Sequence, residues 1–179
     1  MSLVLTPLEF KQRWEQGDKE GFGLQPYTPE ELADVLLPVD ARDFLLIVGL
    51  PCEAYPCLSF DGNLERASVA WGLSPTFARY RVIGSTGSGD PVCIDEGAEG
   101  QIVYLNHDFH FARILMGTSF AAFSTCLLQF RDFPLESEDD PYTNTPESVA
   151  ALFKTLQEID PAACREYEFW WEECQQLLI

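Results

Sequence analysis

Two histidines and an aspartate, close together in the sequence, are the residues best suited to chemistry. His107 and His110 are the only histidines of the chain, and Asp108 lies between them. Imidazoles and carboxylates are common zinc ligands, and a bound zinc ion activates water for hydrolysis. The segment, however, has the pattern of a turn entering a strand, where residues i and i+3 point to opposite faces. Because no His-Glu-x-x-His or Cys-x-x-Cys motif accompanies them, a zinc-dependent hydrolase built on these three residues stays an alternative function.

No other motif predicts a catalytic centre. The glycine run of residues 84–90 ends in an aspartate and lacks the lysine of a phosphate-binding loop, so we interpret it as a turn between strands. No Gly-x-Ser-x-Gly motif marks a serine nucleophile. Cys93 and Cys126 lie in apolar patterns typical of buried, unreactive thiols. We therefore predict no catalytic residue, no metal ion and no cofactor.

The charge of the chain excludes two classes of partner. Its 29 acidic and 11 basic residues give a net charge of −18. Proteins that bind nucleic acids or anionic membranes carry clustered lysine and arginine residues, so we expect this protein to bind neither. The longest apolar stretch, residues 44–50, is far shorter than the roughly 20 residues that cross a bilayer. With no basic signal peptide and with the six cysteines read as reduced thiols, the sequence predicts a cytoplasmic protein, and it leaves the oligomeric state open.

The elements that must position these residues begin with helices. Four capping residues are each followed by proline, which favours a helix start: Thr6-Pro7, Thr28-Pro29, Thr145-Pro146 and Asp160-Pro161. The first helix is predicted to end near residue 17 and the second near residues 36–38, followed by a short helix over 38–48. Apolar stripes predict a helix over 120–130, capped by Thr118 or Ser119, and two more within 149–159 and 167–177.

Between the helices the periodicity changes to that of strands. Residues 79–83, 92–94, 101–105 and 109–115 are separated by short turns, which predicts an antiparallel meander. The predicted fold class is therefore α+β, with a central antiparallel sheet flanked by N-terminal and C-terminal helices. We expect a single domain over residues 1–179, with a core at about 28–133, a linker at 134–146 and an acidic helical extension at about 145–179. Residues 50–78 fit no pattern.

The last predicted helix carries an unusual mixture of aromatic and acidic residues. Phe169, Trp170 and Trp171 stand among four glutamates at positions 166, 168, 172 and 173. This pattern is consistent with an aromatic binding patch ringed by acids, and equally with a helix that packs a wide aromatic face on the rest of the domain.

Several short motifs, in their order along the chain, resemble those of a known superfamily. Residues 36–49 carry Leu-Pro-x-x-x-Arg-x-Phe-Leu and a closing glycine. Residues 89–95 and 100–108 carry Gly-Asp-Pro-x-x-Ile-Asp, Gly-x-Ile-Val and His-Asp, and Ser119 to Phe123 supplies a Ser-x-x-x-Phe motif. Together, over roughly residues 28–175, they resemble the SUKH superfamily (suppressor-of-fused and yeast cell-wall-regulator homology). The Phe169-Trp170 pair is similar to that of a subgroup with a C-terminal helical extension.

The resemblance implies an α+β fold and a function without catalysis. Bacterial members of the superfamily are mostly cytoplasmic immunity proteins of polymorphic toxin systems, which bind a cognate toxin, often a nuclease. It also implies that Gly89, Asp90 and Pro91 form a structural turn before a strand.

We therefore predict an immunity protein that neutralises its toxin by occlusion, with acids placed where a cationic enzyme expects phosphate. The expected contacts are exposed acids at the loop ends of the sheet, with one tryptophan as an anchor: Asp61, Trp71, Asp90, Asp95, Glu96, Glu99 and Asp108. A non-enzymatic regulatory scaffold is the second alternative, beside the hydrolase.

Overall fold

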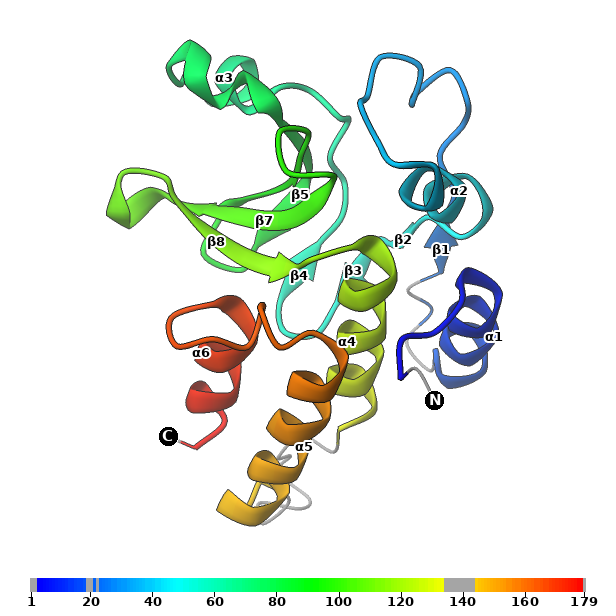
Figure 1. Ribbon diagram of the computed structural model, residues 1–179, viewed down its shortest axis with the longest axis vertical. Coiled ribbons are helices and arrows are strands. Elements are labelled where there is room, and N and C mark those ends of the chain that lie inside the picture. Colours follow the sequence, from blue (N-terminus) through cyan, green and yellow to red (C-terminus); the bar gives the residue numbers. More distant parts are fainter. Residues whose placement is uncertain (1–2, 19–20, 22, 134–143, 179) are drawn as a thin grey trace.

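A six-stranded antiparallel sheet with helices around it forms the centre of the molecule (Figure 1). The computed structural model describes residues 3–18, 21, 23–133 and 144–178. The strand order of the large sheet, β3-β4-β5-β6-β7-β8, follows the order in the chain, and every neighbouring pair is antiparallel. The predicted α+β class with a meander is confirmed, while most of the predicted linker 134–146 lies outside the described residues.

The four long strands match the predicted ones with small shifts. They are β5 (Tyr80–Thr86), β6 (Pro91–Asp95), β7 (Gln101–Asn106) and β8 (Ala112–Gly117). Residues 87–90 of the glycine run form the predicted turn between β5 and β6, whereas residues 84–86 belong to β5. Gly89 in the turn has a φ of 84°, which glycine adopts without strain. The central strand β6 is buried along its whole length, so both faces of the sheet are covered there.

Short strands in the unassigned part of the chain extend the sheet at one edge. Strands β3 (Glu53–Ala54) and β4 (Leu58–Ser59) form a hairpin on β5, and β1 (Leu24–Gln25) pairs with β2 (Leu50–Pro51) as a separate small sheet. Helix α3 (Ala67–Ala70) and the 3-10 turn η1 (Pro75–Arg79) precede β5. A two-residue strand is too short to show the alternation of apolar and polar residues that marks a strand, so the sequence pattern could not predict these strands.

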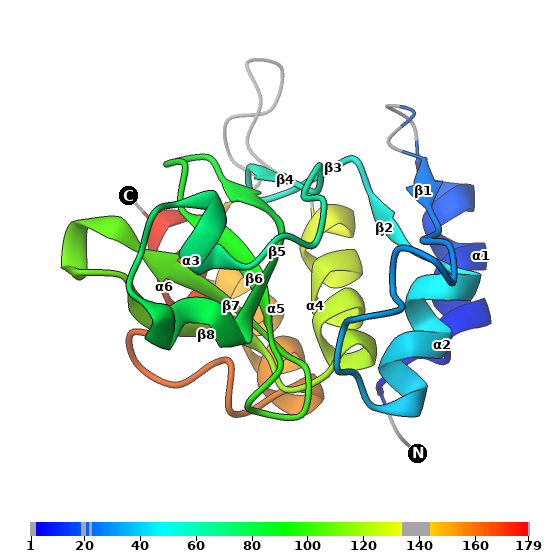
Figure 2. The same ribbon diagram turned by 90° about the horizontal axis from the view of Figure 1, so that it is seen from above.

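Capping confirms three of the predicted helix starts. Helix α1 (Pro7–Gly17) begins with a capping box between Thr6 and Glu9, α5 (Pro146–Ile159) begins at Thr145, and α4 (Phe120–Asp132) is capped by Ser119. The short helix α2 (Val39–Ile47) also lies where it was predicted. Helix α4 lies between the sheet on one side and α1 and α2 on the other (Figure 2), which explains why its buried residues are not confined to one stripe.

The predicted helix over residues 28–38 is wrong. The capping box forms, since Glu31 accepts from the Thr28 N–H, but the chain continues as turns. The Arg42 guanidinium donates hydrogen bonds to the carbonyl oxygens of Leu32 and Val35, at 2.9 and 2.7 Å. The Leu36 N–H, which a helix would direct to Leu32, donates to the Glu96 carboxylate instead. Tertiary hydrogen bonds therefore replace the helical ones.

The predicted helix start at Asp160-Pro161 is also wrong. The buried Asp160 carboxylate accepts hydrogen bonds from the N–H and hydroxyl of Thr118, at 2.7 and 3.0 Å. The following residues form turns, Tyr167 has a φ of 69°, and helix α6 runs only over Phe169–Gln176. None of the described helices has the length and apolar character needed to cross a membrane.

Candidate functional site

Asp95 was expected on the surface, and the structure places it in the interior. Its side chain is 0% exposed and accepts from Arg79 Nε and Nη2, at 2.6 and 2.9 Å, and from Arg113 Nε at 3.2 Å. The Gly97 N–H donates to it as well. Two guanidinium groups thus compensate a buried carboxylate at the end of β6. The expectation that Asp95 is exposed is wrong.

Glu96 is likewise engaged inside the protein. Its side chain is 5% exposed, and its two oxygens accept from Arg81 Nε at 2.9 Å and from Arg66 Nη1 at 3.1 Å. Through the Leu36 N–H it also holds the segment before α2 against the sheet. Glu96 therefore stabilises the fold, and its expected exposure is wrong too.

Asp90 closes the turn at the other end of β6. It is 5% exposed and accepts from the backbone N–H of His107 at 2.8 Å and from the Thr86 hydroxyl at 3.3 Å. The Asp90 N–H donates to the Thr86 hydroxyl at 3.1 Å. The turn at residues 89–91 is therefore structural, as the motif implied, and the expectation of an exposed Asp90 is wrong.

The histidines that suggested a zinc site are not arranged as metal ligands. His107 Nδ1 lies 2.6 Å from Asp90 Oδ1. His107 begins the 3-10 turn η2 (His107–Phe109), and His110 follows it with a φ of 56°. Within the described chain, no three His, Cys, Asp or Glu side chains are grouped so that they could hold a metal ion. The Asp90 carboxylate thus fixes the orientation of the His107 ring.

Contact with Asp90 predicts a pH-dependent property of His107. The Asp90 hydrogen bond, helped by the charge of Asp108, raises the pKa of His107 above its ordinary value of 6.5. We expect Asp90→Asn to lower the pKa of His107 in an NMR titration, and Asp108→Asn to lower it less. Because the folded-state pKa is the higher one, this interaction stabilises the protein fully below pH 6.5 and is lost as pH rises through the folded-state value. An unchanged pKa in Asp90→Asn would contradict the assignment.

The remaining expected contacts are exposed but are not gathered in one place. Asp61 lines a small hollow beside residues 25–27, whereas Asp108 lines a different and larger one. Trp71 is 40% exposed, and its ring packs edge-to-face on Phe111 at 6.1 Å. Glu99 lies in the β6–β7 turn. These four residues remain available for contact with a partner.

The buried thiols of Cys93 and Cys126 are not activated nucleophiles. Burial raises the pKa of the Cys93 thiol to about 12 and raises the pKa of Cys126 well above its ordinary value. All six cysteines carry free thiols, and the predicted burial of Cys93 and Cys126 is confirmed.

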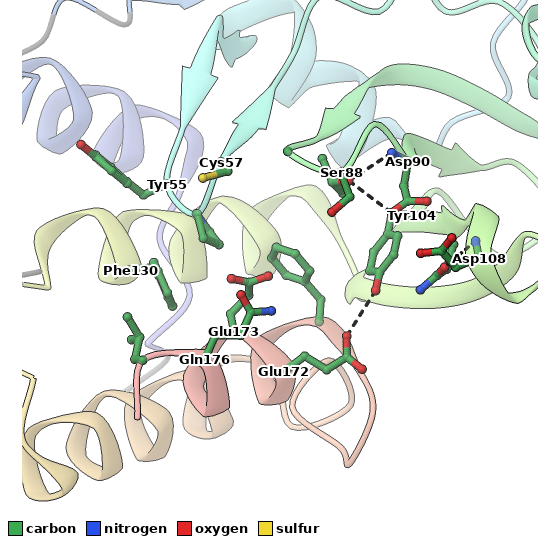
Figure 3. Close-up of a pocket in the computed structure, with 16 residues that line it drawn as sticks. Tyr55, Cys57, Ser88, Asp90, Tyr104, Asp108, Phe130, Glu172, Glu173 and Gln176 are labelled. Carbon is green, nitrogen blue, oxygen red and sulfur yellow. Dashed lines mark hydrogen bonds between the residues drawn. The ribbon is translucent and has the colours of Figure 1, made fainter. Parts of the chain in front are cut away.

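A cleft of about 730 Å³ lies between one end of the sheet and α6 (Figure 3). The β3–β4 hairpin, the β5–β6 turn and the end of β7 form one wall, and α6 with the end of α4 forms the other. Apolar and aromatic side chains line part of it: Tyr55, Pro56, Tyr104, Phe130, Phe169 and Leu177. We call this hollow the α6 cleft.

The α6 cleft is acidic. Asp90, Asp108, Glu172 and Glu173 line it, and the lining residues that the structure describes include no lysine, arginine or histidine. The Tyr104 hydroxyl donates to Glu172 Oε2 at 3.3 Å, which connects the sheet to α6. Burial, together with the nearby charge of Glu172, raises the pKa of Glu173 to about 7.

The sequence gave only a partial indication of this cleft. Of the two interpretations of the last helix, packing holds for Phe169 and Trp170, which are buried. Glu172 and Glu173, on the same helix, nevertheless face the cleft (Figure 3). The opposite wall comes partly from residues 55–57, in the segment for which no pattern was found.

Comparisons with known proteins give one match. The family model described as SUKH-4 immunity protein matches residues 18–177. No curated protein and no solved structure gives a significant match. The match spans almost the whole chain and includes both walls of the α6 cleft.

Proposed function

The chain belongs to the SUKH-4 immunity protein family, and from this membership we propose that it binds and neutralises one cognate toxin protein of a bacterial polymorphic toxin system. Neutralisation is by occlusion in the cytoplasm, without catalysis by the immunity protein itself. The single observation that carries the proposal is the family match over residues 18–177.

The charge of the protein supports a basic target, such as a nuclease. A net charge of −18 raises the association rate with a cationic enzyme through electrostatic steering. The zinc-dependent alternative gains no support, since no three His, Cys, Asp or Glu side chains of the described chain are grouped as metal ligands, and burial suppresses ionisation of the Cys93 thiol. Exposed Asp61, Glu99 and Asp108, with Trp71, remain the proposed contacts among the residues named from sequence.

Co-expression tests this function directly. The toxin domain encoded beside this protein should arrest growth when expressed alone, and co-expression of the protein should restore growth. The purified pair should elute together, with an association rate that falls steeply between low and physiological salt. The control is an unrelated acidic protein of similar net charge, which should neither protect nor bind. Growth arrest that persists on co-expression, without a complex, would contradict the proposal.

A further inference from the structure

The composition of the α6 cleft favours a cation with an apolar stem. Its rim carries carboxylates, whereas partly exposed Tyr55, Pro56 and Leu177 supply apolar surface. An arginine side chain combines both requirements, because its methylene groups cover apolar surface while its planar guanidinium binds carboxylates or stacks on aromatic rings. Asp90 and Asp108 are paired with His107, but a phosphate or a carboxylate would still face Glu172 and Glu173, with no basic side chain among the described lining residues.

The position of the two α6 glutamates directs this charge into the cleft. Figure 3 shows Glu173 and Gln176 pointing from α6 toward the opposite wall, with Glu172 extending to Tyr104. Glu172 receives one long hydrogen bond from Tyr104, on a single oxygen. In the described part of the chain, the Glu173 carboxylate has no hydrogen-bond donor and no basic group beside it, and only burial and the charge of Glu172 shift its pKa. Two adjacent carboxylates, one of them largely removed from water, are thus held without a cation between them.

The size of the cleft indicates more than a single ion. A volume of about 730 Å³ lies within the range of roughly 300–1,000 Å³ that is typical of sites for organic ligands. The cleft is partly open and lies between separate elements, so a loop of a partner can enter with its side chain foremost.

We propose that the α6 cleft receives an arginine side chain from a loop of the cognate toxin, with Glu172 and Glu173 binding the guanidinium. This inference rests on the proposed function for the identity of the partner, but the chemistry of the cleft does not depend on it. Burial of the guanidinium between two carboxylates removes their mutual repulsion and favours the ionised form of Glu173, whose pKa is raised when the cleft is empty. The cleft thereby becomes a specificity site, while the overall negative charge provides steering.

A charge-matched pair of variants tests the proposal in the complex. Glu172→Gln with Glu173→Gln removes two charges from the cleft, and Glu65→Gln with Glu158→Gln removes two from exposed positions elsewhere. Calorimetry with the toxin domain should give a Kd at least tenfold higher for the cleft variant and less than threefold higher for the control. Equal weakening of both variants would show that only the overall charge matters, and it would overturn the cleft proposal, as would no weakening at all.

A second measurement does not need the toxin. N-acetyl-L-arginine amide, titrated at millimolar concentration into the wild-type protein, should shift the NMR amide signals of Gly87, Asn106 and Gln176. The uncharged analogue N-acetyl-L-citrulline amide should not shift them, and the cleft variant should lose the response to arginine. If the arginine probe does not shift these amide signals in the wild-type protein, the proposal is overturned. A response to arginine without any toxin binding would uphold the cleft and overturn the proposed function.

Discussion

Arg81→Met is expected to lower the free energy of unfolding by about 3 kcal/mol or more, because it leaves a buried carboxylate without its closest cation. The Arg81 side chain is 5% exposed, as is that of Glu96, and Nε lies 2.9 Å from the Glu96 carboxylate. The same guanidinium donates to the backbone oxygens of Leu64 and Asp34, at 3.2 and 2.6 Å. Methionine keeps the apolar stem and removes all of these donors.

A second acid on the same arginine provides the control. Asp34 Oδ2 lies 3.0 Å from Arg81 Nη2, but the Asp34 side chain is 77% exposed. Asp34→Asn is therefore expected to cost about 1 kcal/mol or less, since solvent screens an exposed pair. Urea unfolding of the three proteins at neutral pH measures both effects. If both variants lost the same free energy of unfolding, the result would contradict the argument that burial of the ion pair, and not its mere presence, determines how much stability is lost.

The double variant Arg81→Met with Glu96→Leu separates the two causes further. If the loss arises from an uncompensated buried charge, removing that charge should recover part of the stability. Arg66, the other basic partner of Glu96, is 40% exposed and can turn to water. A double variant less stable than Arg81→Met would indicate instead that hydrogen bonds made by Glu96 dominate.

These buried acids show what sequence reasoning can and cannot establish. The meander was predictable because the strands are apolar and the turns are short. Its register places Tyr80 opposite Asp95, which brings Arg79 beside that carboxylate. A single sequence does not give the register. Asp95, at the start of a predicted turn, was therefore interpreted as an exposed contact, whereas it is buried and bound by two arginines.

The failed helix predictions have the same physical origin. The cap at Thr28 is a local signal, and it forms. Continuation of the helix depended on Leu32 and Leu36, whose backbone groups bind Arg42 and Glu96 instead. Local capping therefore predicted where a turn begins, and long-range hydrogen bonds determined what followed it.

The α6 cleft could be anticipated only on one side. The acids of the last helix were visible in the sequence as a ring around aromatic residues. The other wall combines the end of the predicted meander with a hairpin of two-residue strands, with Cys57 between them, and this hairpin gives no periodic signal. A cavity formed by elements more than 100 residues apart in the chain requires the tertiary structure.

A substitution of Trp170 tests whether the acidic C-terminal segment folds together with the sheet or independently of it. The indole is fully buried, and its N–H donates to the Met116 carbonyl on β8 at 2.8 Å. Its ring packs against Phe123 and Phe130 of α4, with centroids 6.3 and 5.7 Å away. Trp170 is therefore the main side-chain link between α6, the sheet and the central helix.

Trp170→Ala is expected to lower the free energy of unfolding by about 3–5 kcal/mol, the usual cost of truncating a buried aromatic residue. Trp171→Ala is the control, because Trp171 is only half-buried and packs on exposed Tyr167, and it should cost about 1 kcal/mol. Thermal unfolding followed by far-UV circular dichroism should show one transition in all three proteins, shifted to lower temperature most strongly in Trp170→Ala. If the C-terminal segment folds independently, Trp170→Ala will instead split the transition and leave the melting of the sheet unchanged. A single shifted transition would mean that the glutamates of the α6 cleft are held in place by the same core that stabilises the sheet.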